Sequence, residues 1–433
     1  MMAQSPQVLR VLTLDGRLLF ATRIVRLFAY GFLSVVLVLY LVQVGLTETE
    51  IGLLLTLTLI GDTAISLWMT TNADRIGRRK MLLVGAGLMV FAGMLFALTG
   101  SFALLVVAAI IGVISPSGNE VGPFLSIEQA ALSQIVPDEA RTRVFAWYNL
   151  VGSFATALGA LGSGVLAHTL QSAGTAPLGS YRVIVILYAG WGLVLGLLFT
   201  RLSPTTESRT TSVKRPFGLH RSRRVVLRLS SLFALDAFAG GFVMQSIIAY
   251  WFYLRFGVEP AVLGSIFFGA NILAGLSALA AARFAERFGL INTMVFTHIP
   301  SNILLMLVPL MPSLPLAIAV LLLRFSISQM DVPTRQSYTM AVVDSDERSA
   351  AAGVTGVART VGAALAPVFT GPMLASSALL SVPFFLAGGL KIAYDLILYG
   401  NFRALKPPEE SGRPMQAASA ARPVDRPQNP ATK

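Results

Sequence analysis

Apolar residues run along this chain in long blocks that short polar stretches separate. Twelve blocks have about the 20 residues that an α-helix needs to cross a hydrocarbon core of about 30 Å. We predict transmembrane helices over residues 20–44, 50–71, 81–100, 103–134, 144–168, 183–201, 227–254, 260–283, 290–311, 314–341, 350–376 and 382–402. Charges and prolines interrupt the fourth and tenth blocks, and we interpret both as helices because irregular backbone exposed to lipid would leave amide groups unpaired.

The two halves of the chain repeat each other. The segment Ala73-Asp74-Arg75-Ile76-Gly77 returns in weaker form as Ala285-Glu286-Arg287-Phe288-Gly289, again between two apolar blocks. Phe28-Ala29-Tyr30-Gly31-Phe32 likewise matches Phe238-Ala239-Gly240-Gly241-Phe242. Glu139-Ala140-Arg141 matches Asp346-Glu347-Arg348 as well, so the spacing between matching positions stays between 207 and 212 residues. Matches in register at that spacing indicate a duplicated helical bundle.

We therefore predict an all-α membrane protein with twelve transmembrane helices in two pseudo-symmetric six-helix bundles. The predicted domains are an N-terminal bundle over residues 1–201, a cytoplasmic basic linker over 202–226, a C-terminal bundle over 227–405 and a disordered cytoplasmic tail over 406–433. With the N-terminus inside, most loop arginines and lysines face the cytoplasm, as the positive-inside rule requires. We expect a multi-pass protein of the cell membrane with both termini in the cytoplasm.

Composition excludes several functions. Hydrophobic residues make up 55% of the chain and charged residues only 12%, against roughly 25% charged in soluble domains. The net charge of +12 comes from residues in loops between apolar blocks, so nucleic-acid binding is a poor interpretation. The chain has no cysteine, and His168, His220 and His298 lack the spacing of metal ligands. We therefore expect no metal site and assign these histidines to loops, polar contacts or packing.

The loop after the second block carries a recognisable motif. Asp74-Arg75-Ile76-Gly77-Arg78-Arg79 resembles the signature that the major facilitator superfamily of secondary transporters carries between helices 2 and 3, with Thr70 in place of the leading glycine. The resemblance covers about residues 15–405. It implies that Asp74 caps a neighbouring helix end and that Arg78 bridges to the other half when the protein opens outward. The predicted gating residues are Asp74, Arg75, Gly77, Arg78, Glu286 and Arg287.

A second family signature is incomplete. The antiporter signature of helix 5 is a glycine-rich run that contains Gly-Pro, and the fifth block has the glycines, among them Gly152, Gly159 and Gly164, but Ala160 where proline is expected. We interpret this run as weak support for an exporter. Small residues also permit close helix packing in any polytopic protein, so that alternative stays open.

Charges inside the apolar blocks mark the candidate site. Each costs at least about 2.5–3.5 kcal/mol at a helix centre unless it is paired or hydrated. Most fall on helices 1, 4, 7 and 10, which line the central cavity in the family. The candidates for binding substrate or proton are Glu120, Arg324, Asp236, Asp331, Arg26 and Asp62. On a continuous tenth helix, Arg324, Asp331 and Arg335 would share one face.

We expect these charges to act at different depths. Glu120 and Arg324 fall near the midplane, where they would flank the substrate. Nearer the cytoplasm, within reach of interfacial water, fall Arg23, Arg26, Glu128 and Arg335. Arg26 and Asp236 hold equivalent positions with opposite charge, and we hypothesise that they join an inner network between the halves. Glu120 is the first candidate for a proton carrier and Asp236 the second. A structural role in helix contacts is the alternative.

Two further pairs are expected. Asp62 in the second block either faces the cavity or pairs with Arg359 of the eleventh block. Lys391 and Asp395 of the twelfth block are four residues apart and are expected to satisfy each other.

We predict a secondary active transporter that moves a small organic solute by alternating access, with proton-coupled efflux of a drug or metabolite as the favoured activity. Uptake or uniport of an anionic metabolite is the alternative, because arginines in helices 1 and 10 suit a carboxylate or phosphate. A membrane receptor or enzyme is a remote alternative, since the sequence has no nucleotide loop, metal cluster or nucleophile with a base. We expect a proton gradient in place of a cofactor, a monomer, and a small-molecule substrate and the lipid bilayer as partners.

Overall fold

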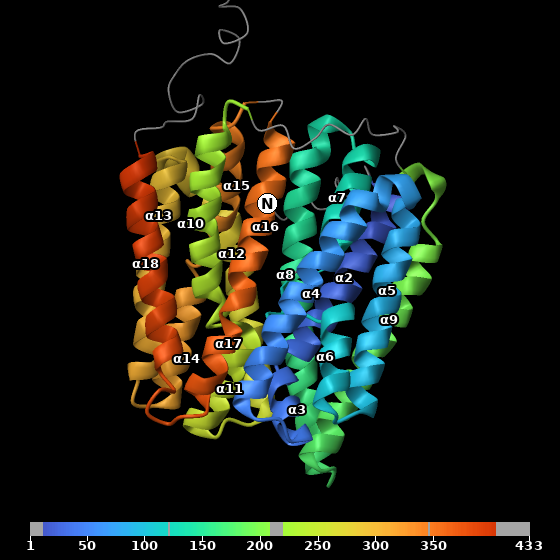
Figure 1. Ribbon diagram of the computed structural model, residues 1–433, viewed down its shortest axis with the longest axis vertical. Helices are drawn as coiled ribbons and strands as arrows, with labels where there is room; N and C mark the ends of the chain where they lie inside the picture. The colour runs from blue at the N-terminus through green and yellow to red at the C-terminus, as the bar shows by residue number, and fades with distance from the viewer. Residues whose placement is uncertain (1–11, 120–121, 208–219, 345–346, 404–433) are drawn as a thin grey trace, which may run out of the picture.

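The chain folds, in a computed structural model, into an upright bundle of helices in two side-by-side groups (Figure 1). The structure describes residues 12–119, 122–207, 220–344 and 347–403. The candidate Glu120, the middle of the predicted linker and the predicted tail lie outside these residues. Across the described ranges the chain forms helices and turns and no strand, so the predicted all-helical fold is confirmed.

Helices of the first group come from residues 12–207, and helices of the second from residues 220–403. The first group contains α2 (Leu14–Ser34), α3 (Leu37–Val44), α4 (Glu48–Ile76), α5 (Arg78–Leu98), α6 (Phe102–Ile111), α7 (Phe124–Ile135), α8 (Asp138–Ser172), α9 (Pro177–Thr200) and the short 3-10 helix η2 (Pro204–Thr206). The second contains α10 (Arg223–Gly241), α11 (Gln245–Phe256), α12 (Pro260–Phe288), α13 (Leu290–Leu307), η3 (Val308–Leu310), α14 (Leu314–Phe325), α15 (Asp331–Ala341), α16 (Arg348–Leu365), α17 (Pro367–Leu374) and α18 (Val382–Phe402). We call these groups the N half and the C half.

Ten of the predicted membrane crossings have the required length. Nine described segments are long and apolar enough to cross a membrane, and the pair α2 and α3, bent by 48°, provides a tenth. The fourth and tenth predicted helices differ from expectation, because each is split into two short helices, α6 with α7 and α14 with α15. The count of twelve continuous helices is therefore not reproduced.

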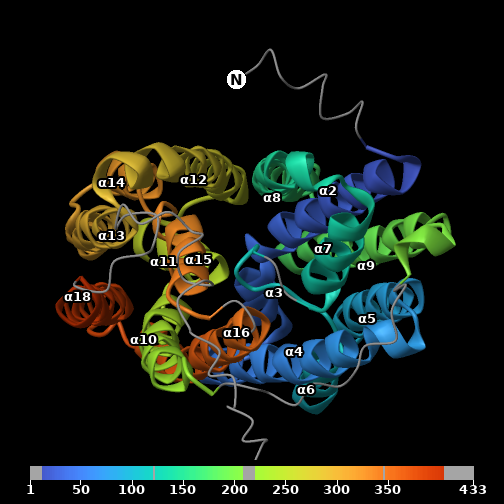
Figure 2. The ribbon, with the colours of Figure 1, turned by 90° about the horizontal axis from the view of Figure 1, so that it is seen from above.

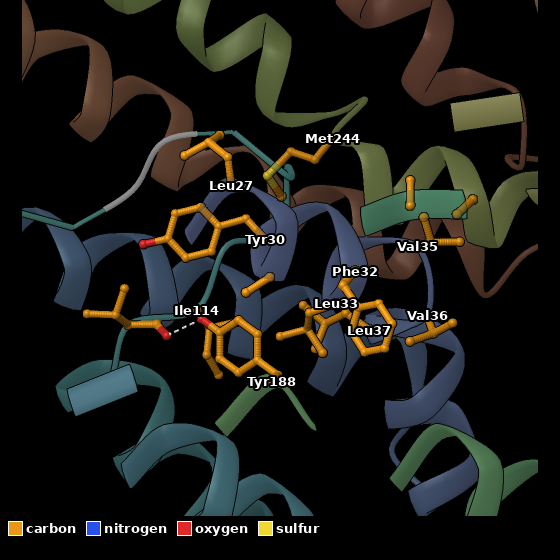
Figure 3. Packing of buried hydrophobic residues seen from close by; sticks show 14 of the residues in the cluster. Leu27, Tyr30, Phe32, Leu33, Val35, Val36, Leu37, Ile114, Tyr188 and Met244 are labelled. Atoms are coloured by element: carbon orange, nitrogen blue, oxygen red, sulfur yellow. Dashed lines mark hydrogen bonds between the residues drawn. The ribbon is translucent and has the colours of Figure 1, made fainter. Parts of the chain in front are cut away.

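Local sequence explains these interruptions. Between α6 and α7 the chain contains Pro116 and two glycines with positive φ, Gly118 at 69° and Gly122 at 81°, which a helix cannot accommodate. This irregular backbone is tolerated because it is buried in protein and its polar groups find partners. Tyr188 donates a hydrogen bond of 2.6 Å to the Val113 carbonyl oxygen, beside Ile114 in Figure 3.

The two ends of the bundle differ in how the halves meet. We call the end where α9 stops and α10 starts the linker end, at the top of Figure 1, and the other the opposite end. The described polar contacts between the halves cluster toward the opposite end. They join Ser34 to Gln245, Glu48 to Tyr250, Thr56 to Val368, Pro116 to Ser246 and His168 to Glu259. The bundle is closed at that end.

Glycines allow this closure. A Cβ atom on Gly371 of α17 would lie 2.3 Å from the Glu48 carbonyl oxygen, and one on Gly164 of α8 would lie 2.4 Å from the Pro260 carbonyl oxygen. Real side chains do not approach this closely, so the backbones of the two halves touch directly. Gly371 follows Gly164 by 207 residues, so the duplication predicted from the sequence reappears in the contact geometry. We call these contacts the glycine seal.

Gly371→Val is expected to open the opposite end. Overpacking of this kind costs about 1–3 kcal/mol, which corresponds to a fall of about 5- to 150-fold in the ratio of closed to open molecules. The reporter is a cysteine at the buried position Ser34 in this cysteine-free chain. Maleimide labelling of Ser34→Cys should accelerate by about that factor.

The matched control for this experiment is Gly389→Val. Gly389 lies in α18, and a Cβ atom there meets nothing within 4 Å, so labelling at position 34 should keep its original rate. An equal rate in the Gly371→Val and Gly389→Val variants would contradict the role of the glycine seal.

Candidate functional site

The N half encloses a buried ion pair. The two terminal guanidinium nitrogens of Arg26 in α2, Nη1 and Nη2, donate to Glu128 in α7 at 2.7 Å each. Both side chains are 0% exposed. Thr22 also donates to this carboxylate, at 2.8 Å, as does the hydroxyl of Tyr148. Such bidentate, charge-assisted bonds offset the cost of removing both charges from water. The prediction that Arg26 and Glu128 reach interfacial water is therefore wrong.

Arg23 is also fully engaged with its own half. Its Nε donates to the Tyr148 carbonyl oxygen at 2.8 Å, and its guanidinium lies 4.3 Å from the centre of the Tyr148 ring. A Cβ atom on Gly152 would lie 2.7 Å from the Arg23 Nε, so the glycine makes room for the guanidinium. This arginine is a structural member of the N half.

A larger charged cluster occupies the C half, where Figure 2 shows α10, α13, α15 and α18 grouped together. Asp236 of α10 accepts a bond of 2.5 Å from Lys391 of α18 and one of 2.9 Å from Arg335 of α15. Arg335 donates in addition to Asp331 at 3.0 Å. All four side chains are buried.

This arrangement corrects three expectations. Arg26 and Asp236 do not pair across the halves, because Arg26 pairs with Glu128 in the N half and Asp236 pairs with Arg335 in the C half. Lys391 does not bond Asp395, since the ammonium reaches Asp236 on the neighbouring helix instead. The predicted exposure of Arg335 to interfacial water is also wrong, as only 3% of its surface is exposed.

His298 of α13 completes the cluster. Its Nδ1 lies 2.9 Å and 3.0 Å from the two carboxylate oxygens of Asp395, and its Nε2 lies 3.9 Å from Oδ1 of Asp236. Asn302 donates to Asp395 at 3.4 Å. Sequence reasoning gave this histidine a loop, polar-contact or packing role and did not place it between two carboxylates. The signal it overlooked is a titratable residue inside an apolar block.

Two arginines of the C half keep unsatisfied atoms. The Nε atoms of Arg324 in α14 and Arg359 in α16 are buried and have no hydrogen-bond partner among the described residues. Ser328 lies in the turn that follows α14, and its buried hydroxyl likewise has no hydrogen-bond partner among the described residues. Because the helix breaks at this turn, Arg324 does not share a continuous face with Asp331 and Arg335, contrary to expectation.

Asp62 has a partner on its own helix. Its carboxylate accepts a weak bond of 3.5 Å from Ser66 in α4, and no ion pair joins Asp62 to Arg359 in the described structure. Arg359 interacts electrostatically with Arg335, Asp236 and Asp331 instead.

The predicted gating motif holds the start of the linker. Arg78 donates from Nε to Asp74 at 2.8 Å and from another guanidinium nitrogen to Gln134 at 3.0 Å. Gly77, with φ of 116°, ends α4, and the first backbone N–H groups of α5 then donate to the Glu207 carboxylate. A carboxylate at a helix N-terminus is favourable because the N–H groups there lack partners within the helix. These described contacts stay within the N half.

The remaining motif residues are solvent-facing. Arg75, Glu286 and Arg287 are exposed, and Gly289 repeats the positive φ of Gly77 with a value of 85°. Their assignment to gating stays a prediction.

A second carboxylate anchors the start of α10. Glu347, which precedes α16, accepts bonds of 2.6, 2.8 and 2.9 Å from the backbone N–H groups of His220, Arg221 and Ser222. Burial by itself raises the pKa of this carboxyl, but the three N–H donors outweigh it and lower the pKa to about 2.

Glu128→Gln should destabilise the protein strongly. The substitution leaves the Arg26 charge buried without its partner, which costs about 3–5 kcal/mol. Thermal unfolding of the purified protein in detergent measures the loss. The double substitution Arg26→Met with Glu128→Met removes both charges and should recover most of the stability. A double variant as unstable as Glu128→Gln would contradict the ion-pair explanation.

Glu347 should make stability depend on pH below about 4.5. Because its pKa is lowered from 4.5 to about 2 in the folded protein, its contribution is fully present above pH 4.5 and is lost as the pH falls toward 2. Unfolding temperatures measured between pH 5 and pH 2.5 should therefore fall less steeply in Glu347→Gln. The control Glu286→Gln, at an exposed residue, should keep the slope of the unsubstituted protein.

Comparisons with known proteins agree with the architecture. A mutant of the nucleoside transporter NupG superposes with a TM-score of 0.71 at 13% identity, over 90% of this chain and all of that one. A D-xylose-proton symporter gives 0.68 at 15% identity, over 89% and 97%. The human organic anion transporter MFSD10 gives 0.62 at 16%, over 89% and 100%. At such low identities these likenesses show the fold alone.

Sequence relatives are more specific. An uncharacterized membrane protein of Saccharomyces cerevisiae, YJR124C, is 32% identical over 418 residues, which is 89% of this chain and 93% of the yeast protein. The model of the Major Facilitator Superfamily matches residues 19–367, a range that contains the Asp74–Arg78 motif and the Arg26–Glu128 and Asp236–Arg335 pairs but ends before α18. The chain belongs to the Major Facilitator Superfamily of membrane transporters.

Proposed function

We propose that this transporter carries small organic anions across the membrane by alternating access. The observation that carries the proposal is the balance of charge inside the C half. Three buried or partly buried carboxylates, Asp236, Asp331 and Asp395, face four basic side chains, Arg335, Lys391, Arg359 and Arg324. One positive charge is therefore in excess when His298 is neutral.

The excess charge is available to a ligand. The Nε atoms of Arg324 and Arg359 are buried without partners among the described residues, and a buried N–H donor left unpaired costs free energy that a bound acceptor recovers. A carboxylate or phosphate supplies such an acceptor together with the opposite charge. In the N half, by contrast, Arg26 and Arg23 already have acceptors. The C half therefore provides the anion-binding wall.

The closed opposite end supports alternating access. A small crevice in the closed region, lined by Glu48, Gly52 and Tyr250 among others, has room for about one water molecule, so it does not pass a solute. At the linker end, the motif residues Asp74 and Arg78 bond each other rather than the C half. In the predicted orientation this is a state that faces the cytoplasm, in which the family gate is released.

The direction of transport stays a prediction. Three of the four glycines of the fifth block, on which the exporter interpretation depends, have a packing role: Gly152 makes room for Arg23, Gly159 for the Phe28 carbonyl and Gly164 for α12. These contacts explain the three glycines without reference to efflux. Solved transporters of the same fold handle a nucleoside, xylose and organic anions, which supports a small polar solute in place of a lipophilic drug.

Proton coupling is part of the proposal, and its carrier differs from the first expectation. Glu120 lies outside the described residues, and Asp236 is held by two cations. We therefore favour His298 and the groups next to it as the site that binds the coupled proton.

Uptake into liposomes tests the substrate class. Purified protein would be supplied with radiolabelled citrate, glucuronate or benzoate, with xylose and uridine as neutral solutes and tetraphenylphosphonium as a cation. We expect flux of at least one anion and a fall of about 10- to 150-fold in Arg324→Gln or Arg359→Gln, because each loses a charge-assisted bond of about 1.5–3 kcal/mol.

The matched control is Arg255→Gln, which removes one positive charge from the exposed end of α11. Its anion flux should equal that of the unsubstituted protein. Transport of xylose or uridine without any anion would show that the substrate class is wrong, and undiminished anion flux in both interior variants would remove their assigned role.

A further inference from the structure

His298 stands between two carboxylates in the interior of the C half. Its Nδ1 is within 3.0 Å of both oxygens of Asp395, whereas its Nε2 is 3.9 Å from Oδ1 of Asp236. An ionised carboxylate only accepts hydrogen bonds, so the hydrogen of the neutral ring belongs on Nδ1. The Nε2 lone pair then faces a second acceptor across a gap too long for a hydrogen bond.

This gap is a place for a proton. With a proton on Nε2, the ring carries a positive charge between two carboxylates, and the unfavourable approach of two acceptors becomes an ion pair. Histidine is the side chain whose charge ordinarily changes between pH 5 and pH 8. The ring is 5% exposed, and the edge of the Tyr394 ring packs against it with centroids 6.1 Å apart.

His298 itself contacts Asp395 and Tyr394 on α18 and lies near Asp236 on α10. The other titratable or charged groups of the C-half interior are Lys391 on α18, Asp331 and Arg335 on α15, Arg359 on α16 and Arg324 on α14. The charged residues of α12, Arg283, Glu286 and Arg287, are exposed at its linker end.

Asp236 connects the histidine to the arginines. It interacts electrostatically with Lys391, His298, Arg335 and Arg359. A protonated His298 is a further cation near Asp236. The negative charge of Asp236 then compensates the positive charges of Arg335 and Arg359 less completely. The positive excess of the C half then rises from one charge to two, in an interior where unbalanced charge is costly. An anion that binds beside Arg359 lowers that cost.

We propose that His298 is a proton-binding site that couples proton binding to anion binding, which makes the protein a proton–anion symporter. The proposal rests on the proposed function, since it requires an anionic substrate. By linkage, a proton on His298 strengthens anion binding, and a bound anion strengthens proton binding by the same factor. The proton site lies on the side of the C half away from the N half, because His298 and Asp395 belong to α13 and α18 at the periphery of the C half, while α15 and α16 lie nearer the N half (Figure 2).

The protonation of His298 can be observed without any substrate. The chain has only three histidines, so ¹⁵N-histidine labelling in nanodiscs gives three imidazole signals, and the one lost in His298→Gln belongs to this site. We expect that signal, followed from pH 8 to pH 5, to report binding of a proton to the ring, and we expect the tautomer to change in Asp395→Asn. A signal that stays constant over this range would overturn the proposal.

The coupling is tested by calorimetry with glucuronate, citrate and benzoate at pH 5.5, 6.5 and 7.5. Above the titration point of His298, affinity should fall by up to about 10-fold per pH unit, as coupling to one proton requires. His298→Gln should bind with an affinity that no longer depends on pH. His220→Gln is the matched control, because the His220 side chain is exposed and the residue bonds Glu347 through its backbone N–H, and it should keep the pH dependence.

The outcomes separate the two proposals. A pH dependence that persists unchanged in His298→Gln overturns the coupling role while anion transport stands. No binding of any anion by the unsubstituted protein at any pH overturns the anion assignment and the symport mechanism with it, and the NMR titration then reports whether His298 still takes a proton.

Discussion

A guanidinium paired with a carboxylate in the interior of each half is the interaction on which this bundle depends. Neither charge tolerates burial without its partner, so Arg26 with Glu128 ties α2 to α7, and Arg335 with Asp236 ties α15 to α10. Asp236 follows Arg26 by 210 residues and Arg335 follows Glu128 by 207. The two pairs are therefore equivalent in the repeat, with the charges exchanged between the helices.

The exchange accompanies a division of labour between the halves. In the N half the pair is closed by Thr22 and Tyr148, and its carboxylate has no free acceptor position for a further cation. In the C half the same position has become a network in which Lys391 and His298 surround Asp236 and two arginines keep unpaired nitrogens. The buried ion pair of the N half is thus fully satisfied, whereas the charge distribution of the C half can be changed by a ligand or a proton.

Much of the fold was predictable from the sequence, because the bilayer requires long apolar helices and the duplication leaves matching residues at a constant spacing. The breaks inside the fourth and tenth predicted helices were harder to anticipate. Lipid excludes irregular backbone, but the protein interior admits it wherever a side chain such as Tyr188 satisfies the released carbonyl. A pattern of hydrophobicity does not distinguish these two environments.

The candidate site shows the same limit. Charged residues inside apolar blocks were recognised as groups that need a partner or water, yet the burial of Arg26, Glu128 and Arg335 was missed and the pairing was mispredicted. Lys391 and Asp395 are one helical turn apart, but the ammonium reaches across to α10 and leaves Asp395 to His298. Spacing along one helix describes only neighbours on that helix, and partner choice between helices depends on rotations that no single segment encodes.

The glycine seal makes closure of the opposite end partly independent of the surrounding solution. Its backbones meet through van der Waals contact at Gly371 and Gly164, a force that dissolved salt does not screen. One helical turn after Gly164, His168 pairs with Glu259 of the other half through side chains that are 48% and 67% exposed, and salt weakens such a pair when the histidine is protonated. Closure therefore combines one contact that the medium reaches with another that it does not, so changes in salt or pH remove only part of what holds the halves together at this end.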